Sequence, residues 1–299
     1  MSESIIMALF VGNYGESILP LAPPVDLDTS LQKIFPNITY STTPCLDATV
    51  PLYFGATLLG ERRINSIAVL DDGNLVGDFR FLDAMRHMYP LRDTDKTPQD
   101  LLNVEVKIVM SPRPNTLDIR ATLRVLLRLI ESSRTGSVFI VADSRIVGQV
   151  TLTGVLRWLL YAKPKIDATA ADIASSALVS ASKNATIGRI VELMLDRYVR
   201  KVILRKGRKI VGVVDDRGVT NMIFGSQCNR TSFRELFKQP VTPQMTQIGY
   251  VKGRTSLPDV SLQVLRQVSQ CVLVEGDGIV TPWDIAIKGL RSIAQSQAE

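Results

Sequence analysis

A chain of 299 residues, of which 45% are hydrophobic, is long enough for two ordinary domains and apolar enough to pack a core in each. No stretch approaches the ~18 uninterrupted apolar residues of a membrane helix. The apolar residues 5–11 follow Glu3 rather than the basic segment of a secretory signal, so we expect a cytoplasmic protein without a membrane partner.

The cysteines and the single histidine argue against two kinds of chemistry. Cys45, Cys228 and Cys271 are widely scattered, a spacing typical of neither a disulfide framework nor a metal site. His87 lies in an apolar helical stretch with no cysteine or serine nearby, which disfavours a catalytic triad.

The net charge of +6 is unevenly distributed. Residues 1–165 hold 17 basic and 17 acidic side chains, whereas residues 166–299 hold 18 basic and 12 acidic ones. A basic second half favours anionic partners, which include nucleotides, nucleic acid and acidic proteins, and does not choose among them.

Taken in chain order, one pattern occurs four times. An apolar strand, a tight polar turn and a second strand with a glycine follow each other at 66–77, 137–148, 201–212 and 270–278. The β-branched runs and the Asp, Gly, Asn or Ser turns are typical of short antiparallel hairpins. The glycines at 77, 148, 212 and 278 are 71, 64 and 66 residues apart, which indicates a repeat of about 65 residues.

A helix with one apolar face is predicted before each hairpin. The third repeat shows it best, with apolar residues at helical spacing: Ile187, Ile190, Val191, Met194, Leu195 and Tyr198. Each repeat is therefore predicted as strand, helix, strand, strand, helix, in an α+β (α/β layered) fold.

A unit this small leaves a sheet or helix face uncovered and should pair with a second copy. We expect a first pair at 37–165 and a second pair at 166–299, with a break at 163–165. Residues 1–36 form a lead-in segment to which the pattern assigns no role.

The order of elements, together with the ending Gly-Ile-Val-Thr-Pro-Trp-Asp at 278–284, resembles the cystathionine-β-synthase (CBS) domain family over roughly residues 37–297. The resemblance implies that two repeats form a Bateman module and that two modules pack as a flat disk, within one chain or in a homodimer. It implies that clefts between repeats bind AMP, ADP, ATP or S-adenosylmethionine. Four repeats in one chain are similar in architecture to the regulatory γ subunit of AMP-activated protein kinase.

The family's ligand motif is a glycine, two apolar residues, Thr or Ser, two variable residues and Asp. A carboxylate can accept both ribose hydroxyls, while a hydroxyl and the free amides of a helix start can receive phosphate. Only repeat four carries the motif whole, with Thr281 and Asp284, so it is the leading candidate site. The same residues also suit a helix cap that needs no ligand, and both interpretations stay open.

The other repeats depart from this motif. Repeat one keeps Asp83 but has Arg80 at the hydroxyl position, where it could meet phosphate or pair with Asp83. Repeat two keeps Thr151 and has Gly154 in place of the aspartate. Repeat three has Asp215 in place of the hydroxyl, and its charge should repel phosphate, so we expect no nucleotide there.

The resemblance adds four candidates outside the motif. Arg200 and Lys201 precede a strand at a place where family clefts are lined, which makes them candidates for phosphate contact. Thr246 and Ile248 precede the first strand of repeat four and would line the base pocket.

We therefore expect a non-catalytic regulatory sensor that binds an adenine nucleotide or S-adenosylmethionine, foremost in the second pair, and requires no cofactor. The repeats leave too little chain for a catalytic domain, and no phosphate-cradling glycine loop or metal cluster occurs. The regulated enzyme or transporter would be a separate chain. The alternative is a basic module that binds nucleic acid or protein and has no nucleotide site.

Overall fold

The computed structural model describes residues 27–35, 43–62, 65–134, 136–143, 145–162, 166–225, 230–275 and 278–289. The expected break at 163–165, most of the lead-in segment and Cys228 lie outside these residues. None of the described helices is long and apolar enough to span a membrane.

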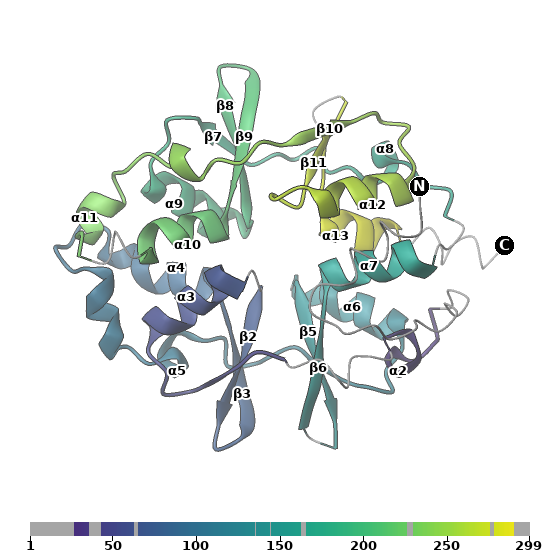
Figure 1. Cartoon of the computed structure of the whole chain (residues 1–299), viewed down its shortest axis with the longest axis horizontal. Coiled ribbons are helices and arrows are strands. Elements are labelled where there is room, and N and C mark those ends of the chain that lie inside the picture. Colours follow the sequence, from purple (N-terminus) through teal and green to yellow (C-terminus); the bar gives the residue numbers. More distant parts are fainter. Residues whose placement is uncertain are drawn as a thin grey trace. The chain divides into compact units, whose positions relative to one another are not determined.

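Four three-stranded sheets confirm the predicted repeats (Figure 1). In each sheet the first strand runs parallel to the second, and the third is antiparallel to the second. A helix connects the first two strands and another follows the third, which confirms the order strand, helix, strand, strand, helix.

The elements have the following bounds. Repeat one comprises β1 (Cys45–Asp47), α3 (Leu52–Arg62), β2 (Ser66–Asp71), β3 (Asn74–Arg80) and α4 (Phe81–Met88). Repeat two comprises β4 (Thr116–Asp118), α6 (Leu123–Ser133), β5 (Ser137–Ala142), β6 (Arg145–Thr151) and α7 (Leu152–Ala162). Repeat three comprises β7 (Ser180–Ser182), α9 (Ile187–Arg197), β8 (Lys201–Lys206), β9 (Lys209–Asp215) and α10 (Asp216–Phe224). Repeat four comprises β10 (Gly249–Val251), α12 (Leu257–Arg266), β11 (Val272–Val274), β12 (Gly278–Val280), α13 (Pro282–Asp284) and the π-helix Ile285–Gly289.

The connecting segments form short helices. They are α2 (Leu31–Ile34) before repeat one, the 3-10 helices Tyr89–Leu91 and Pro98–Asn103 with α5 (Val106–Val109) before repeat two, α8 (Ala170–Ile173) before repeat three, and α11 (Phe233–Leu236) with the 3-10 helix Thr242–Gln244 before repeat four.

The apolar face predicted for α9 is confirmed over most of its length. Ile187, Ile190, Val191 and Met194 are fully buried. Tyr198 is an exception: the prediction placed it on this face, yet its side chain is exposed. The reason is its backbone, which has a φ of 56° and ends the helix in the left-handed conformation, so the ring turns away from the core.

The chain divides into two compact units, each with its own apolar core. One consists of residues 43–114 and 177–248 and contains repeats one and three; the other consists of residues 1–42, 115–176 and 249–299 and contains repeats two and four. In the unit of repeats one and three, α3 contacts α10 and α4 contacts α9. The members of each sequential pair, 37–165 and 166–299, lie in different units, so that pairing stays a prediction.

The described part of the lead-in belongs to the core of repeat two. Leu27, Leu31 and Ile34 are buried, and the Leu31 amide donates to the Ala121 carbonyl at 2.8 Å. These contacts give the end of the lead-in segment a structural role that its sequence did not indicate.

The glycines that mark the repeats allow another segment to cross the third strand. Backbone bonds join Asp78 and Ser111 in both directions at 2.9–3.0 Å, and a Cβ at Gly77 would lie 2.8 Å from the Ser111 carbonyl oxygen. In repeat three a Cβ at Gly212 would lie 2.7 Å from the Thr246 carbonyl oxygen. The segment that leads to the next repeat thus packs on the sheet edge and excludes any side chain at these positions.

Candidate functional site

The motif residues of repeats one and four close a cap at the start of their second helix. In repeat four the Thr281 amide donates to Asp284 Oδ2 at 2.9 Å and its hydroxyl donates to the same oxygen at 2.7 Å. In repeat one the Arg80 amide donates to Asp83 Oδ2 at 3.0 Å. The carboxylate at the third helical position therefore satisfies the backbone of the capping residue, as in a capping box.

Repeats two and three reach the same result with the roles reversed. In these repeats the third helical residue is glycine. The side chain of the capping residue accepts a hydrogen bond from the amide of this glycine. Gly154 donates to Thr151 Oγ1 at 3.0 Å, and Gly218 donates to Asp215 Oδ1 at 2.8 Å. The residue types at this motif thus provide a cap in all four repeats, which is the structural interpretation left open by the sequence.

Asp284 has partners at both carboxylate oxygens. Its side chain is buried, and Oδ1 accepts the Ser175 hydroxyl at 2.6 Å and lies 3.0 Å from Lys288 Nζ. Lys288 also donates to the Ile173 carbonyl at 2.8 Å. A ribose that binds Asp284 must therefore displace Thr281, Ser175 or Lys288.

Arg80 lies between two buried carboxylates. Its Nε is 3.1 Å from Asp83 Oδ2 and 3.2 Å from Asp78 Oδ2. Its Nη2 donates to Ser111 Oγ, which in turn donates to Asp83 Oδ1 at 3.2 Å. Of the two roles expected for Arg80, pairing with Asp83 is present, and 25% of the side chain is exposed.

Asp78 and Asp83 are both buried, and both form ion pairs with Arg80. Burial raises the pKa of Asp78 to about 6 against the opposing pull of Arg80, and Asp78 Oδ1 has no hydrogen-bond partner among the described residues. Burial likewise raises the pKa of Asp83 against Arg80 and Ser111.

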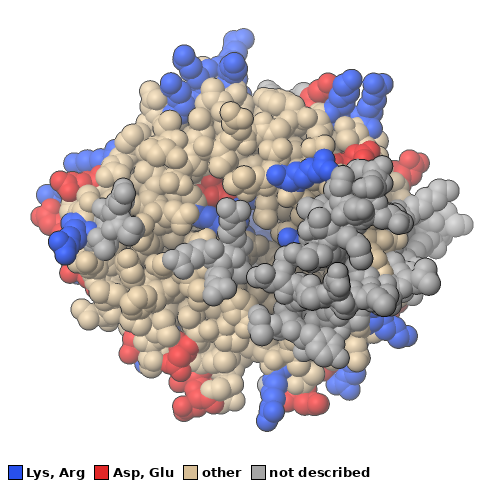
Figure 2. Space-filling model, viewed as in Figure 1, with Lys and Arg blue, Asp and Glu red and all other residues tan. Residues whose placement is uncertain are grey.

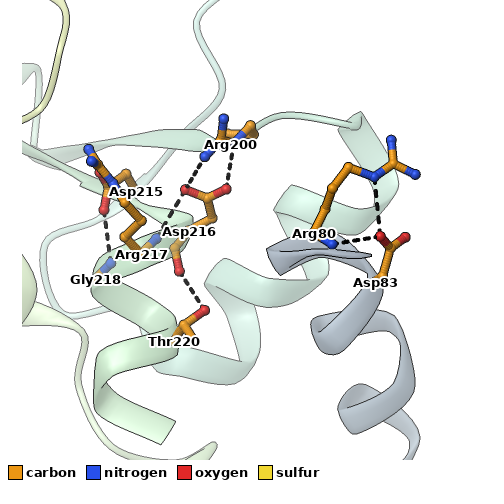
Figure 3. Close-up of polar contacts among 8 residues, drawn as sticks. All are labelled: Arg80, Asp83, Arg200, Asp215, Asp216, Arg217, Gly218 and Thr220. Carbon is orange, nitrogen blue, oxygen red and sulfur yellow. Dashed lines mark hydrogen bonds and ion pairs between the residues drawn. The ribbon is translucent and has the colours of Figure 1, made fainter. Parts of the chain in front are cut away.

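Arg200 forms the corresponding ion pair in repeat three. Its Nε and Nη2 donate to the two oxygens of the buried Asp216, the second at 3.2 Å (Figure 3). Burial lowers the pKa of Arg200, but the Asp216 carboxylate outweighs it and raises the pKa above its usual value. The guanidinium is therefore a permanent cation, and 32% of the side chain is exposed.

Asp215, the residue expected to repel phosphate, carries its own counter-ion. Arg217 Nη2 lies 2.8 Å from Asp215 Oδ2. Burial raises the pKa of Asp215, whereas Arg217, the Gly218 amide and Lys201 lower it, and the net pKa is below the usual value. The charge of Asp215 is thus offset locally.

Arg80 and Arg200 lie in the same unit, beside the starts of α4 and α10 (Figure 3). They are close enough for the charge of Arg80 to lower the pKa of Arg200. Each guanidinium uses Nε and Nη2 in its own repeat. Within the described part of the chain, Nη1 of neither arginine makes a hydrogen bond.

The remaining candidates are divided between the two units. Lys201 lies opposite Asp215 in the β8–β9 register, and Thr246 is tied to β9 by a hydroxyl bond to the Val213 carbonyl at 3.2 Å. Ile248 is half-buried at the end of the same unit. The second unit contains the three others, Thr151, Thr281 and Asp284.

Several functional neighbours were missed by the sequence reasoning. Ser111 and Ser175 were not among the candidates, yet they occupy the same place on the crossing segments as the predicted Thr246, where each of the three pairs with a third strand. A signal was present, because Met110-Ser111 and Met245-Thr246 are similar dipeptides shortly before a first strand. No local pattern identifies Asp216 as the partner of Arg200, since sixteen residues separate them.

Comparisons with known proteins agree with this architecture. The CBS domain family model matches residues 104–161 and 170–225, which cover most of repeats two and three. MJ1225 from Methanocaldococcus jannaschii, proposed as an archaeal homologue of γ-AMPK, matches with a TM-score of 0.75 and 14% identity over 86% of this chain and 99% of that one. An uncharacterized conserved protein from Pyrococcus horikoshii matches with a TM-score of 0.51 and 15% identity, over 74% and 89% of the two chains.

A search of the curated proteins finds no match. At the identities of the two solved structures, likeness shows the fold alone. The family match and the four sheets together define an architecture of tandem CBS domains. Residues 104–161 and 170–225 match the CBS domain family model, and the four repeats of the chain have an arrangement similar to that of MJ1225.

Proposed function

We propose that this CBS protein is a non-catalytic sensor of an adenosine-containing ligand, for which the candidates are AMP, ADP, ATP and S-adenosylmethionine. Two guanidiniums in one unit favour a ligand with phosphate groups over the cationic sulfonium of S-adenosylmethionine. We therefore place the three nucleotides first.

The observation that carries the proposal is the pair Arg80 and Arg200. Both side chains are partly exposed, both are held in place by buried carboxylates, and neither Nη1 forms a hydrogen bond to the described residues. Two like charges at short range repel each other, and a phosphate between them removes that repulsion. The helix starts at α4 and α10 add positive potential at the same place.

The other candidate residues take subordinate roles in this proposal. Lys201 is next to Arg200 and provides a further cation for a second phosphate. Thr246 and Ile248 lie on the same unit and are the candidates for contact with the base. Asp284 lies in the other unit and is a candidate only for a separate site, at which a ribose would have to displace Thr281, Ser175 or Lys288.

Regulation follows if the ligand prefers one arrangement of the repeats. Arg80 belongs to repeat one and Arg200 to repeat three, so an anion that contacts both stabilises the arrangement in which they face the same ligand. We propose that a separate enzyme or transporter chain responds to this difference.

Isothermal titration with AMP, ADP, ATP and S-adenosylmethionine tests the proposal. The wild-type protein should bind at least one nucleotide, and the double variant Arg200→Gln with Asp216→Asn should bind at least tenfold more weakly, the loss expected of one charged hydrogen bond. This variant removes both charges of the pair and leaves no buried carboxylate without a counter-ion.

Arg197→Gln is the matched control, because this arginine is exposed on α9 and should leave affinity unchanged. If the wild type releases no heat with any ligand at millimolar concentration, the sensor proposal is wrong. If Asp284→Ala abolishes binding and the Arg200 variant does not, the site lies in repeat four instead.

A further inference from the structure

The hairpin tip of repeat three gathers five basic side chains. Lys206, Arg208 and Lys209 are exposed at the turn between β8 and β9, and Arg205 is half-buried beside them. Lys183 joins the group because its amide donates to the Arg205 carbonyl at 2.8 Å. Figure 2 shows Lys and Arg side chains together at the edge where Figure 1 draws this hairpin.

These five charges, which we call the basic tip, are not neutralised by neighbours. Within the described residues, none of the five side chains forms an ion pair, and Arg205 makes only a bond from Nη1 to the Arg208 carbonyl at 3.1 Å. Lys206 and Lys209 are direct cross-strand partners in the β8–β9 register. Like charges in that position repel each other, so this pair destabilises the hairpin.

The turn itself does not require basic residues. Gly207, with a φ of 60°, supplies the left-handed residue of this turn. In repeat one the corresponding turn uses Asp72 and Gly73, with φ values of 48° and 78°, and follows Asp71. The same hairpin is therefore compatible with acidic residues, and the fold itself does not require the charge of the basic tip.

We propose that the basic tip docks on the phosphate backbone of duplex nucleic acid. Cations on a narrow two-stranded ribbon match a row of phosphates, and such a ribbon fits the major groove. Residues 201–212 contain no aromatic side chain, so the tip has no platform on which the bases of a single strand could stack. The proposal goes beyond the nucleotide sensor, because none of the five residues belongs to the site at Arg80 and Arg200.

The number of contacts sets the expected salt dependence. Each phosphate neutralised on a duplex contributes about −0.9 to the slope of log K against log salt, so five contacts give a slope of about −4.5. Binding should be independent of sequence, because backbone contacts carry no base information.

The test uses fluorescence anisotropy of a short mixed-sequence DNA duplex over a range of salt. The tip variant Lys206→Gln, Arg208→Gln, Lys209→Gln should bind more weakly at low salt, with a slope shallower by about 2.7. The control variant Lys33→Gln, Arg197→Gln, Lys238→Gln removes the same net charge from other exposed positions and should keep the wild-type slope to within about one contact.

Three outcomes overturn the proposal. The first is a wild-type protein that does not bind the duplex at low salt. The second is a control variant that loses as much affinity as the tip variant, which would indicate net charge rather than the basic tip. The third is binding of a polyglutamate peptide that depends on the tip while the duplex does not bind, because the partner is then an acidic protein. Titration of the same variants with nucleotides tests the proposed sensor site separately from duplex binding.

Discussion

Asp78 shows how one residue can link the candidate site to pH. It lies on β3 beside Arg80, with one oxygen facing the guanidinium and the other without a partner in the described structure. The charges that act on its pKa are those of Arg80, on the same strand, and Asp83, on α4. Burial is the main reason that its pKa is about 6, and the charge of Asp83 adds to it.

The stability of the protein should reflect this carboxyl group. Since the pKa is about 6 when folded and ~3.9 when unfolded, the folded state binds more protons in between, and stability falls as pH rises from 4 to 6. The shift corresponds to a loss of about 3 kcal/mol. The free energy of unfolding of Asp78→Asn, measured with denaturant, should lack this loss.

The exposed tip carboxylate Asp72 provides the comparison. Asp72→Asn should follow the wild-type pH dependence, because its side chain is in water. If wild type and Asp78→Asn differ by the same free energy at pH 4 and pH 7, Asp78 is not the group that titrates.

At the scale of elements, the repeat could be predicted from the sequence. The pairing of the crossing segments with the third strands could not. Runs of β-branched residues on either side of turn residues identified all four hairpins, and the 3.6-residue spacing identified their helices. The crossing segments at Ser111, Ser175 and Thr246 pair with strands far away in sequence, so no local pattern shows their partners. The glycines at 77 and 212 were recognised as markers of the repeat. The reason that glycine is needed there is the close approach of the crossing segment, which only the packing shows.

Substitution of these glycines tests the crossing. Gly212→Ala should destabilise the protein by ~1–3 kcal/mol, because its Cβ would lie 2.7 Å from the Thr246 carbonyl oxygen and backbone would have to move. Thermal or denaturant unfolding measures the loss.

Gly154→Ala is the matched control. Its Cβ would meet only Thr151 Oγ1, at an ordinary 3.4 Å, in the first turn of a helix. This change should be neutral or stabilising by up to ~1 kcal/mol, since alanine favours a helix. Equal losses at the two positions would contradict a specific role for the crossing segment.

The sequence predicted several residues of the candidate site, but it did not predict the partners with which they form ion pairs and hydrogen bonds. The motif identified Thr281, Asp284, Arg80 and Asp83, all of which lie at helix starts. Their ion pairs depend on Ser111, Asp78 and Lys288, and such partners are decided by tertiary packing. The motif favoured repeat four, whereas the partly exposed arginines whose Nη1 atoms form no hydrogen bond to the described residues belong to repeats one and three.

At the scale of the whole chain, repeats one and three form one compact unit and repeats two and four the other. The excess positive charge of residues 166–299 has two concentrations in the first of these units, one at Arg200 and Lys201 and one at the basic tip. We assign the first to a nucleotide and the second to duplex nucleic acid. The two proposals use different residues and can fail independently.

A crystal structure of the full chain grown with AMP or ATP tests the central claim most directly. The account predicts phosphate oxygens within about 3 Å of the guanidiniums of Arg80 and Arg200, as in charge-assisted hydrogen bonds. Nucleotide bound elsewhere, with both arginines in their present ion pairs, would contradict the account.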